Sequence, residues 1–246
     1  MSKLKFAFLL LMTFGIISCS STPEPETSQT AEALYNEAHE LLDKTSYKKA
    51  AETFERVEME HPYSKWATKA KVMAAYSYYR DKKYDDAIMA LDRFIRFHPG
   101  NKDIAYAYYM KAMSYYEQIS DVTKDQSNTE KALDALYQVT TRFPDSDFAK
   151  DANFKIDLTN DHLAGKEMEV GRYYLSQKNY LSALNRFSVV VNSFQTTSHI
   201  EEALYRQVEL YNILGLFDEA QNAGKILNHN YPQSSWNKKA RSLLKS

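Results

Sequence analysis

Few side chains in this sequence could carry out covalent chemistry. It contains one cysteine, Cys19, and six histidines scattered over 246 residues, of which His61 and His98 directly precede prolines. The motifs HExxH and GxSxG and glycine-rich phosphate loops are absent from the sequence. A lone cysteine allows neither a disulfide nor a thiolate metal site within the chain. We therefore expect a protein that is not an enzyme, with no catalytic residue, no cofactor and no metal ion.

The residues before Cys19 indicate what its thiol is for. Two lysines give a positive start, residues 6–17 are apolar almost throughout, and the small Ser18 precedes the cysteine. This layout is typical of a secretory signal peptide over residues 1–18, and an apolar run of about 12 residues is too short to span a membrane, which takes about 20. The end of the run, IISC, resembles the lipobox of bacterial lipoproteins, in which the cysteine becomes the new N-terminus and carries acyl chains such as palmitate. The alternative is an ordinary signal peptide beside which Cys19 happens to lie.

The residues after the cysteine indicate a location. By the same resemblance, Ser20 in place of aspartate implies attachment to the outer membrane, on its periplasmic face. One acyl chain holds a protein only marginally, whereas several hold it stably. Residues 20–30 contain two prolines and no large apolar residue, so they cannot bury a core. We expect a flexible tether over residues 19–31 that starts from the lipidated cysteine.

Composition favours helix and gives no sign of a nucleic-acid partner. The net charge is −1, from 31 lysines and arginines against 32 aspartates and glutamates, and no basic block occurs. Glycine and proline number only six each, while tyrosine numbers 19. Few turns are signalled, and no alternating segment of useful length predicts a strand. An all-α chain is therefore expected.

A repeated pattern predicts where the helices lie. Five segments share an alanine three residues after their first residue, and four of them have a proline fifteen residues after it. These segments start at Tyr47, Tyr84, Thr129, Tyr180 and Phe217. Alanine permits close contact between helices, and proline cannot continue a helix. Each segment is therefore expected to form a helix of about three turns.

A second helix precedes each of these segments. Nine residues before four of the starts lie Ala38, Ala75, Gly171 and Val208, each followed three residues later by a bulky side chain. The third unit has Ala112 in this place and an eight-residue insertion, DVTKDQSN. The pattern resembles the tetratricopeptide repeat, whose helix pairs stack to bury a continuous core. We expect a superhelical array of five tetratricopeptide-like helix pairs.

The array divides into two halves. Residues 32–145 contain repeats 1–3, which we call the front half, and residues 146–246 contain a linking helix and repeats 4–5, the back half. The segment between the third and fourth units lacks proline and has apolar residues at helical spacing. It predicts one long helix, or two nearly continuous ones. Gly165 and Gly171 would be its weak points, because glycine costs about 1 kcal/mol relative to alanine in a helix.

Two stretches resemble a more specific family. LDRFIRFHP and EVGRYYLSQKNYLSALNRF, together with the lipoprotein start, are similar to the BamD family of outer-membrane protein assembly lipoproteins over nearly all of residues 32–246. The resemblance implies a subunit of the complex that inserts β-barrels, with the barrel protein BamA and other lipoproteins as partners. It implies that the front repeats receive the C-terminal strand of unfolded barrel proteins and that the back repeats dock BamA. The stretch TKDQSNTEKAL departs from the family, which leaves the role of its loop open.

The first helices of the front half offer a surface for an extended peptide. In such repeats, the residues one, four and five places after the small position, and three places before it, face the concave groove. The expected peptide-binding residues are Tyr35, His39, Tyr76, Tyr79, Arg80, Tyr109, Met113 and Tyr116. Tyrosine offers a large apolar area with a polar tip, and Arg80 could pair with a terminal carboxylate. The alternative is that the tyrosines pack between helices.

Two arginines of the back half are candidates for contact with BamA. Arg186 lies in ALNRFSVVV, close to Leu184 and Phe187, and Arg172 lies on the preceding helix. The family resemblance implies docking in this region, and arginine is enriched at interfaces. The alternative is that both side chains are simply solvated.

Two other classes of repeat lipoprotein are alternatives to the assembly role. Coordinators of cell division that associate with peptidoglycan usually carry a coiled-coil segment, and none is seen in this sequence. Lipoproteins that capture surface glycans tend to have long insertions rich in tryptophan. Here only Trp66 and Trp236 occur, each just after a predicted helix end.

Overall fold

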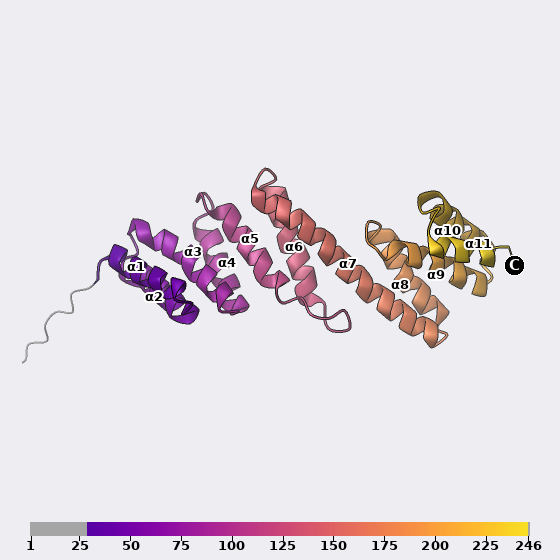
Figure 1. The fold of residues 1–246 in the computed structure, drawn as a ribbon, viewed down its shortest axis with the longest axis horizontal. Helices are drawn as coiled ribbons and strands as arrows, with labels where there is room; N and C mark the ends of the chain where they lie inside the picture. Colours follow the sequence, from indigo (N-terminus) through magenta and orange to yellow (C-terminus); the bar gives the residue numbers. More distant parts are fainter. Residues whose placement is uncertain (1–28, 246) are drawn as a thin grey trace, which may run out of the picture.

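The structure, a computed structural model, describes residues 29–245, which form eleven α-helices and no strand (Figure 1). The predicted signal peptide, Cys19 and most of the predicted tether lie outside these residues. The helices are α1 (Ala31–Asp43), α2 (Tyr47–Glu60), α3 (Lys65–Arg80), α4 (Tyr84–Phe97), α5 (Ile104–Tyr116), α6 (Ser127–Arg142), α7 (Asp147–Ser176), α8 (Tyr180–Ser193), α9 (Ile200–Ile213), α10 (Phe217–Asn230) and α11 (Ser235–Leu243).

The predicted repeat is confirmed, and the second helices begin where the pattern places them. Helices α2, α4, α8 and α10 start at the first residue of their segments, and α6 starts two residues earlier, at Ser127. The repeated alanines, Ala50, Ala87, Ala132, Ala183 and Ala220, are all 0% exposed. They sit where neighbouring helices touch, so a larger side chain there would overpack the core at a cost of about 1–3 kcal/mol.

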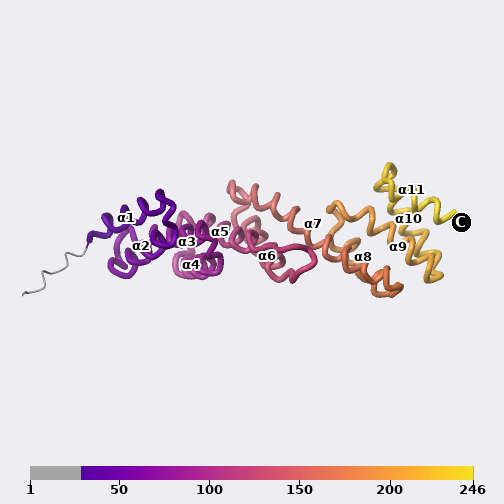
Figure 2. Tube along the Cα trace, turned by 60° about the horizontal axis from the view of Figure 1, so that its bottom comes forward, coloured from indigo at the N-terminus to yellow at the C-terminus, as the bar shows by residue number. Residues whose placement is uncertain are grey.

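The array is elongated, with successive helix pairs side by side and the two ends of the described chain far apart (Figures 1 and 2). Five clusters of buried side chains follow one another along it, each made by adjoining helices. A stack of this kind buries its apolar faces between neighbours instead of around one centre. The surface that such an array offers is therefore long and formed by several repeats at once.

Helix α7 links the two halves as one uninterrupted helix of 30 residues. It continues through both glycines, for which the structure gives packing reasons. A Cβ atom at Gly171 would lie 2.6 Å from Cε1 of Phe187, and one at Gly165 would lie 3.2 Å from Nε2 of His199. Absence of a side chain at Gly171 lets α8 approach α7 closely.

Helix α11 was not predicted from the repeat pattern. It begins after Ser234, whose side chain accepts a hydrogen bond from the Trp236 amide at 3.1 Å. Ala240 is buried, and Trp236 and Leu244 pack against the cluster formed by α9 and α10. The last repeat has no following pair to cover its apolar side, and α11 supplies that cover.

Candidate peptide-binding surface

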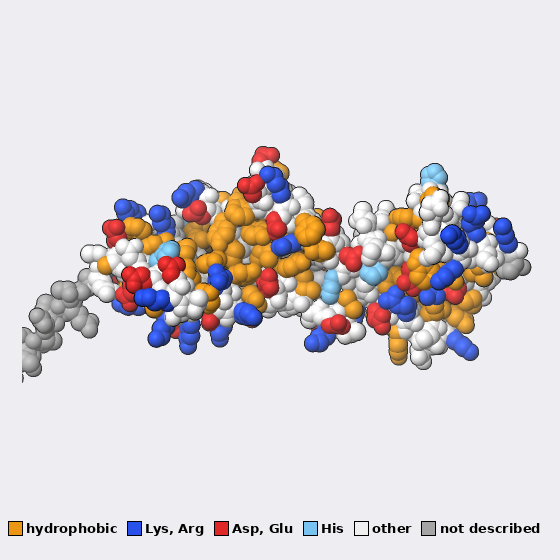
Figure 3. Space-filling model, in the orientation of Figure 1, with side chains coloured by type: hydrophobic (Ala, Val, Ile, Leu, Met, Phe, Trp, Pro, Cys, Tyr) orange, Lys and Arg blue, Asp and Glu red, His pale blue; other side chains and the backbone are white. Residues whose placement is uncertain are grey.

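One face of the front half is lined by aromatic side chains. Figure 3 shows hydrophobic side chains, tyrosine among them, gathered over α3, α5 and the first half of α7. Their rings lie against the core clusters, yet each residue remains partly exposed. We call this set the front tyrosine surface; it consists of Tyr76, Tyr79, Arg80, Tyr106, Tyr109 and Tyr116. These rings therefore pack between helices in part and keep some exposed area, and their role in binding a peptide stays a prediction.

Arg80, at the end of α3, is held between two tyrosines. Its Nη1 donates to the hydroxyl oxygen of Tyr76 and its Nη2 to that of Tyr47, both at 2.7 Å. The guanidinium also lies 4.9 Å from the ring centre of Tyr47. The hydrogen bond to Tyr76, with the electrostatic attraction of the Tyr76 and Tyr47 side chains, raises the pKa of Arg80. A guanidinium has five N–H donors, so this exposed side chain keeps free donors for a carboxylate.

Tyr79 ties the third and fifth helices together. Its hydroxyl donates to Oε1 of Glu117 at 3.4 Å, and its ring meets that of Tyr84 edge-on, with 5.7 Å between centres. Burial, followed by the charge of Glu117, raises the pKa of Tyr79 to about 12. The phenol therefore stays neutral and a hydrogen-bond donor at any physiological pH.

Tyr109 and Tyr116 are linked through α7. The Tyr109 hydroxyl donates to Oδ2 of Asp151 at 2.5 Å, and burial together with this hydrogen bond raises the pKa of Tyr109. Asp151 pairs with Lys155 at 3.4 Å, and the Lys155 ammonium lies 5.2 Å from the ring centre of Tyr116. The rings are fixed before any ligand arrives, which lowers the entropy cost of binding.

The other three expected groove residues do not belong to the front tyrosine surface. Tyr35 packs on Phe54 and Trp66, with ring centres 5.3 and 4.7 Å apart. His39 is exposed, and its Nδ1 lies 3.3 Å from Oδ2 of Asp43. Met113 is only 8% exposed, so it supports the surface from beneath and offers little area of its own.

One residue of the front tyrosine surface, and several residues that contact the surface, were not predicted from the sequence. Tyr47 comes from α2 and Asp151 and Lys155 come from α7, whereas the positional rule considered only the first helices of the front half. Tyr106 lies one turn before Tyr109 on α5 and was also missed. A tyrosine recurs at the first position of α2, α4 and α8, which is the one signal that could have pointed to Tyr47.

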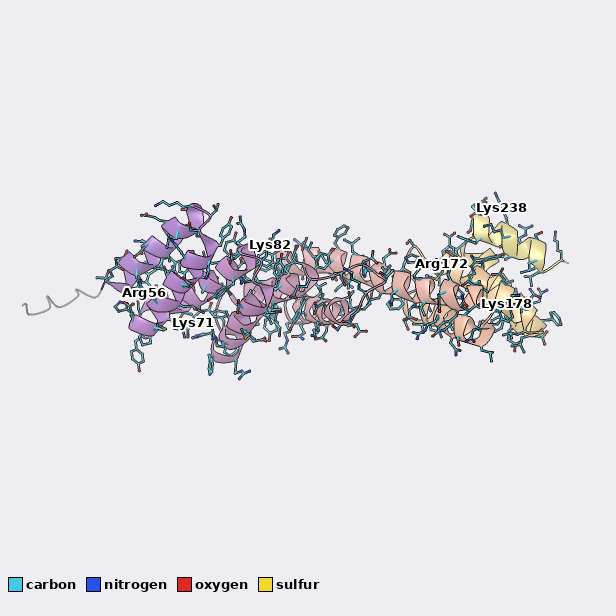
Figure 4. The ribbon with its side chains drawn as sticks, turned by 90° about the horizontal axis from the view of Figure 1, so that it is seen from below. Arg56, Lys71, Lys82, Arg172, Lys178 and Lys238 are labelled. Atoms are coloured by element: carbon cyan, nitrogen blue, oxygen red, sulfur yellow. The ribbon has the colours of Figure 1, made fainter. Side chains whose placement is uncertain are left out.

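The two arginines of the back half are engaged in ion pairs. Arg172 on α7, labelled in Figure 4, contacts Glu202 and Glu169, both at 3.2 Å. Arg186 on α8 contacts Glu167 at 3.1 Å. The two arginine side chains are 37% and 44% exposed. Both arginines are thus oriented by acidic neighbours and remain partly open to a partner.

The described residues contain neither a candidate metal site nor a candidate membrane-spanning helix. Between residues 29 and 245, no three or more histidine, cysteine, aspartate or glutamate side chains gather in a way that could hold a metal ion. None of the helices in this part of the chain has the length and apolar character needed to cross a membrane.

Comparison with known proteins gives strong matches over most of the chain. Residues 27–227 match the family model YfiO, described as "Outer membrane lipoprotein". An outer membrane protein assembly factor BamD of Rickettsia prowazekii (strain Madrid E) is 51% identical over 213 residues, covering 87% of this chain and 85% of that protein. The protein of the same name from Caulobacter vibrioides (strain ATCC 19089 / CIP 103742 / CB 15) is 41% identical over 239 residues, covering 96% and 78%.

A solved structure aligns more weakly. The crystal structure of a thermophilic tetratricopeptide-repeat protein of Thermus thermophilus aligns with 88% of this chain and 100% of its own, at 17% identity and a TM-score of 0.38. A similarity of this size says nothing further about function.

Proposed function

Because this chain belongs to the YfiO family of outer membrane lipoproteins, we propose that it is a non-catalytic scaffold in the assembly of outer-membrane β-barrel proteins. Two relatives that carry the name of an outer membrane protein assembly factor match most of its length, which supports this role. In this role the front half binds unfolded barrel proteins and the back half docks a BamA-like barrel protein.

The front tyrosine surface is the observation that carries the substrate part of this proposal. It offers partly exposed aromatic rings in fixed positions, with Arg80 at one side. The last strand of a barrel protein alternates apolar and polar residues and ends in an aromatic residue and a carboxylate. The tyrosine rings contact the apolar side chains of the strand, and their hydroxyls exchange hydrogen bonds with it. The guanidinium of Arg80 pairs with the terminal carboxylate.

Removal of two rings tests this surface. We expect Tyr79→Ala combined with Tyr116→Ala to weaken binding of a peptide with the C-terminal sequence of a barrel protein by roughly tenfold or more, because buried tyrosines dominate interfaces of this kind. Binding is measured by fluorescence anisotropy, and circular dichroism checks that helix content is kept.

A matched control removes two tyrosines elsewhere. Tyr63 and Tyr137 are 101% and 47% exposed and lie outside the front tyrosine surface. Tyr63→Ala with Tyr137→Ala should leave peptide affinity unchanged. Equal affinities of the two double variants would remove the substrate role from this surface.

The docking and anchoring parts complete the proposal. Arg172 and Arg186 would contribute to contact with the BamA-like partner from the back half, where their glutamate neighbours orient them. Residues 1–18 would be removed as a signal peptide, and acylation of Cys19 would hold the chain at the periplasmic face of the outer membrane. Identification of the barrel protein that co-purifies with the chain from solubilised envelopes tests the docking part, and the mass of the N-terminal peptide tests the anchor.

A further inference from the structure

The turn between α2 and α3 exposes an unusual group of side chains. Tyr63 is 101% exposed, and Met59, the residue before the last one of α2, is 74% exposed. Trp66 follows in the first turn of α3, with the ammonium groups of Lys65 and Lys69 at 5.4 and 5.2 Å from its ring centre. We call this group the aromatic–lysine turn.

The two lysines carry charge that the rest of the described chain does not neutralise. Neither Lys65 nor Lys69 forms an ion pair within residues 29–245, and both are exposed. The acidic residues at the end of α2 are already paired: Glu58 lies 3.1 Å from Lys71, and Glu60 lies 2.9 Å from Arg56. The turn therefore presents a local positive charge beside the fully exposed ring of Tyr63 and the partly buried ring of Trp66.

The corresponding turns of the other repeats lack this combination. The position of Tyr63 is taken by Gly100, Asp145, Thr196 and Gln233 in the later repeats. A tryptophan near lysines occurs again only at the last turn, where Trp236 lies 4.0 Å from the ammonium of Lys239 but no exposed tyrosine precedes it. The feature belongs to the first repeat and is not a requirement of the repeat fold.

Gln29, the first described residue, contacts this same turn. His61 Nε2 lies 2.7 Å from the carbonyl oxygen of Gln29 and donates to it, so the start of the described chain is attached to the aromatic–lysine turn. Gln29 is ten residues from Cys19. Ten residues reach at most about 35 Å. A lipid on Cys19 would thus keep this turn within about 35 Å of the membrane, so that the turn can reach the surface.

We propose that the aromatic–lysine turn rests on the phospholipid surface to which the chain is anchored. Tryptophan and tyrosine favour the interface between headgroups and hydrocarbon because their rings are apolar with a polar tip. Lysines near the surface are attracted to anionic headgroups, and their long stems let the charge reach the phosphates while the rings enter the interface. This contact sets the orientation of the array, with the first repeat at the membrane.

The proposal rests on the proposed anchor at Cys19, and the experiment is designed to separate the two. Cys19 is the only cysteine, so the chain from Cys19 onward can be coupled through this thiol to maleimide-bearing lipids in vesicles. Coupling holds the chain at the surface whether or not the cell acylates it. Failure of natural acylation, seen in the mass of the N-terminal peptide, would disprove the anchor and leave this measurement intact.

Two tryptophans at opposite ends of the array report on lipid contact. Trp66 lies in the first repeat and Trp236 in α11, far from it (Figures 1 and 2). The Trp236→Phe variant retains Trp66, and Trp66→Phe retains Trp236. In vesicles with anionic phospholipids and nitroxide-labelled headgroups, we expect loss of Trp66 emission and no loss of Trp236 emission. Equal quenching of the two, or no quenching of Trp66, would overturn the proposal.

A charge variant gives a second readout that keeps both tryptophans. Each lysine near an anionic surface raises the binding constant about fivefold. Lys65→Gln with Lys69→Gln should therefore lower the equilibrium constant for contact of the turn with the membrane roughly 25-fold, and abolish most of the quenching of Trp66. The matched control, Lys238→Gln with Lys239→Gln, makes the same charge change beside Trp236, and Figure 4 shows Lys238 at the end of the array opposite Arg56 and Lys71. Equal effects of the two variants would mean that the turn does not bind lipid through its lysines.

Discussion

At the scale of single residues, the front tyrosine surface is held in place by hydrogen bonds that cross between helices. Tyr79 donates to Glu117, Tyr109 donates to Asp151, and Arg80 bridges two phenols. Each such bond adds only about 1 kcal/mol to stability, so their main effect is to fix side-chain positions. A surface made of fixed rings loses little conformational entropy when it binds a ligand.

Titration of Tyr79 tests this description of the surface. Its pKa in the folded chain is raised to about 12, above the ordinary value of about 10 for tyrosine. The stabilisation of the neutral phenol is therefore complete below pH 10 and is lost as pH rises through 12. We expect the difference in tyrosinate absorbance between the wild-type chain and Tyr79→Phe to show one group that titrates near pH 12. If the tyrosine that the variant lacks instead titrates at the ordinary pKa of about 10, Tyr79 is solvated and has no hydrogen-bond partner.

At the scale of elements, the packing of α8 against the long helix α7 requires a glycine at position 171. A methyl group at Gly171 would lie 2.6 to 3.0 Å from three ring atoms of Phe187, which is 0% exposed and cannot swing into solvent. Gly171 therefore permits the contact between α7 and α8. Through that contact the fourth and fifth repeats are joined to the linking helix that follows the third repeat.

Substitution of Gly171 gives a prediction for this contact. Alanine should favour the helix by about 1 kcal/mol, but the clash should cost more, about 1–3 kcal/mol as other overpacked cores do. We expect Gly171→Ala to lower the free energy of unfolding by about 1–2 kcal/mol in urea titrations. Gly100→Ala is the control, because no atom lies within 4 Å of a Cβ there. A stabilised Gly171→Ala chain would show that α8 can move away without loss.

The elements differ in how far the sequence predicted them. Ten helices follow from local signals: alanine at a fixed offset, proline after the second helix, and a proline-free stretch for α7. Helix α11 lacks the repeat signature because it covers the last pair instead of forming a new one. The aromatic positions on α3 and α5, except Tyr106, follow from helical spacing. Their partners on α2 and α7 depend on how repeats stack in space. That stacking cannot be read from spacing within one repeat.

At the scale of the whole molecule, the two halves are connected through α7 and the loops that contact it. Lys166 on α7 lies 3.4 Å from the carbonyl oxygen of Thr123, in the insertion of the third repeat. Asp161 on the same helix accepts hydrogen bonds from the amide and hydroxyl of Ser198, at 2.9 and 2.8 Å, in the loop before α9. The insertion thus braces the middle of α7 from the front half, and the α8–α9 loop braces it from the back half.

These connections join the repeats into one long array, whose parts have different binding partners in our proposals. In our proposals the first repeat meets the membrane, the front tyrosine surface receives unfolded barrel proteins, and the back half docks the barrel partner. An array whose halves are joined by a continuous helix keeps these sites at set distances. The central claim is that substrate meets the first helices of the front half, not the second helices.

Site-specific photocrosslinking in cells tests that claim most directly. A photoreactive amino acid replaces Tyr76 or Tyr116 on the first helices, or the exposed Met89 or Tyr137 on α4 and α6 as controls. We expect adducts with newly made outer-membrane barrel proteins at Tyr76 and Tyr116, and none at Met89 and Tyr137. Adducts confined to the second helices, or the absence of barrel adducts at both first-helix positions, would contradict the account.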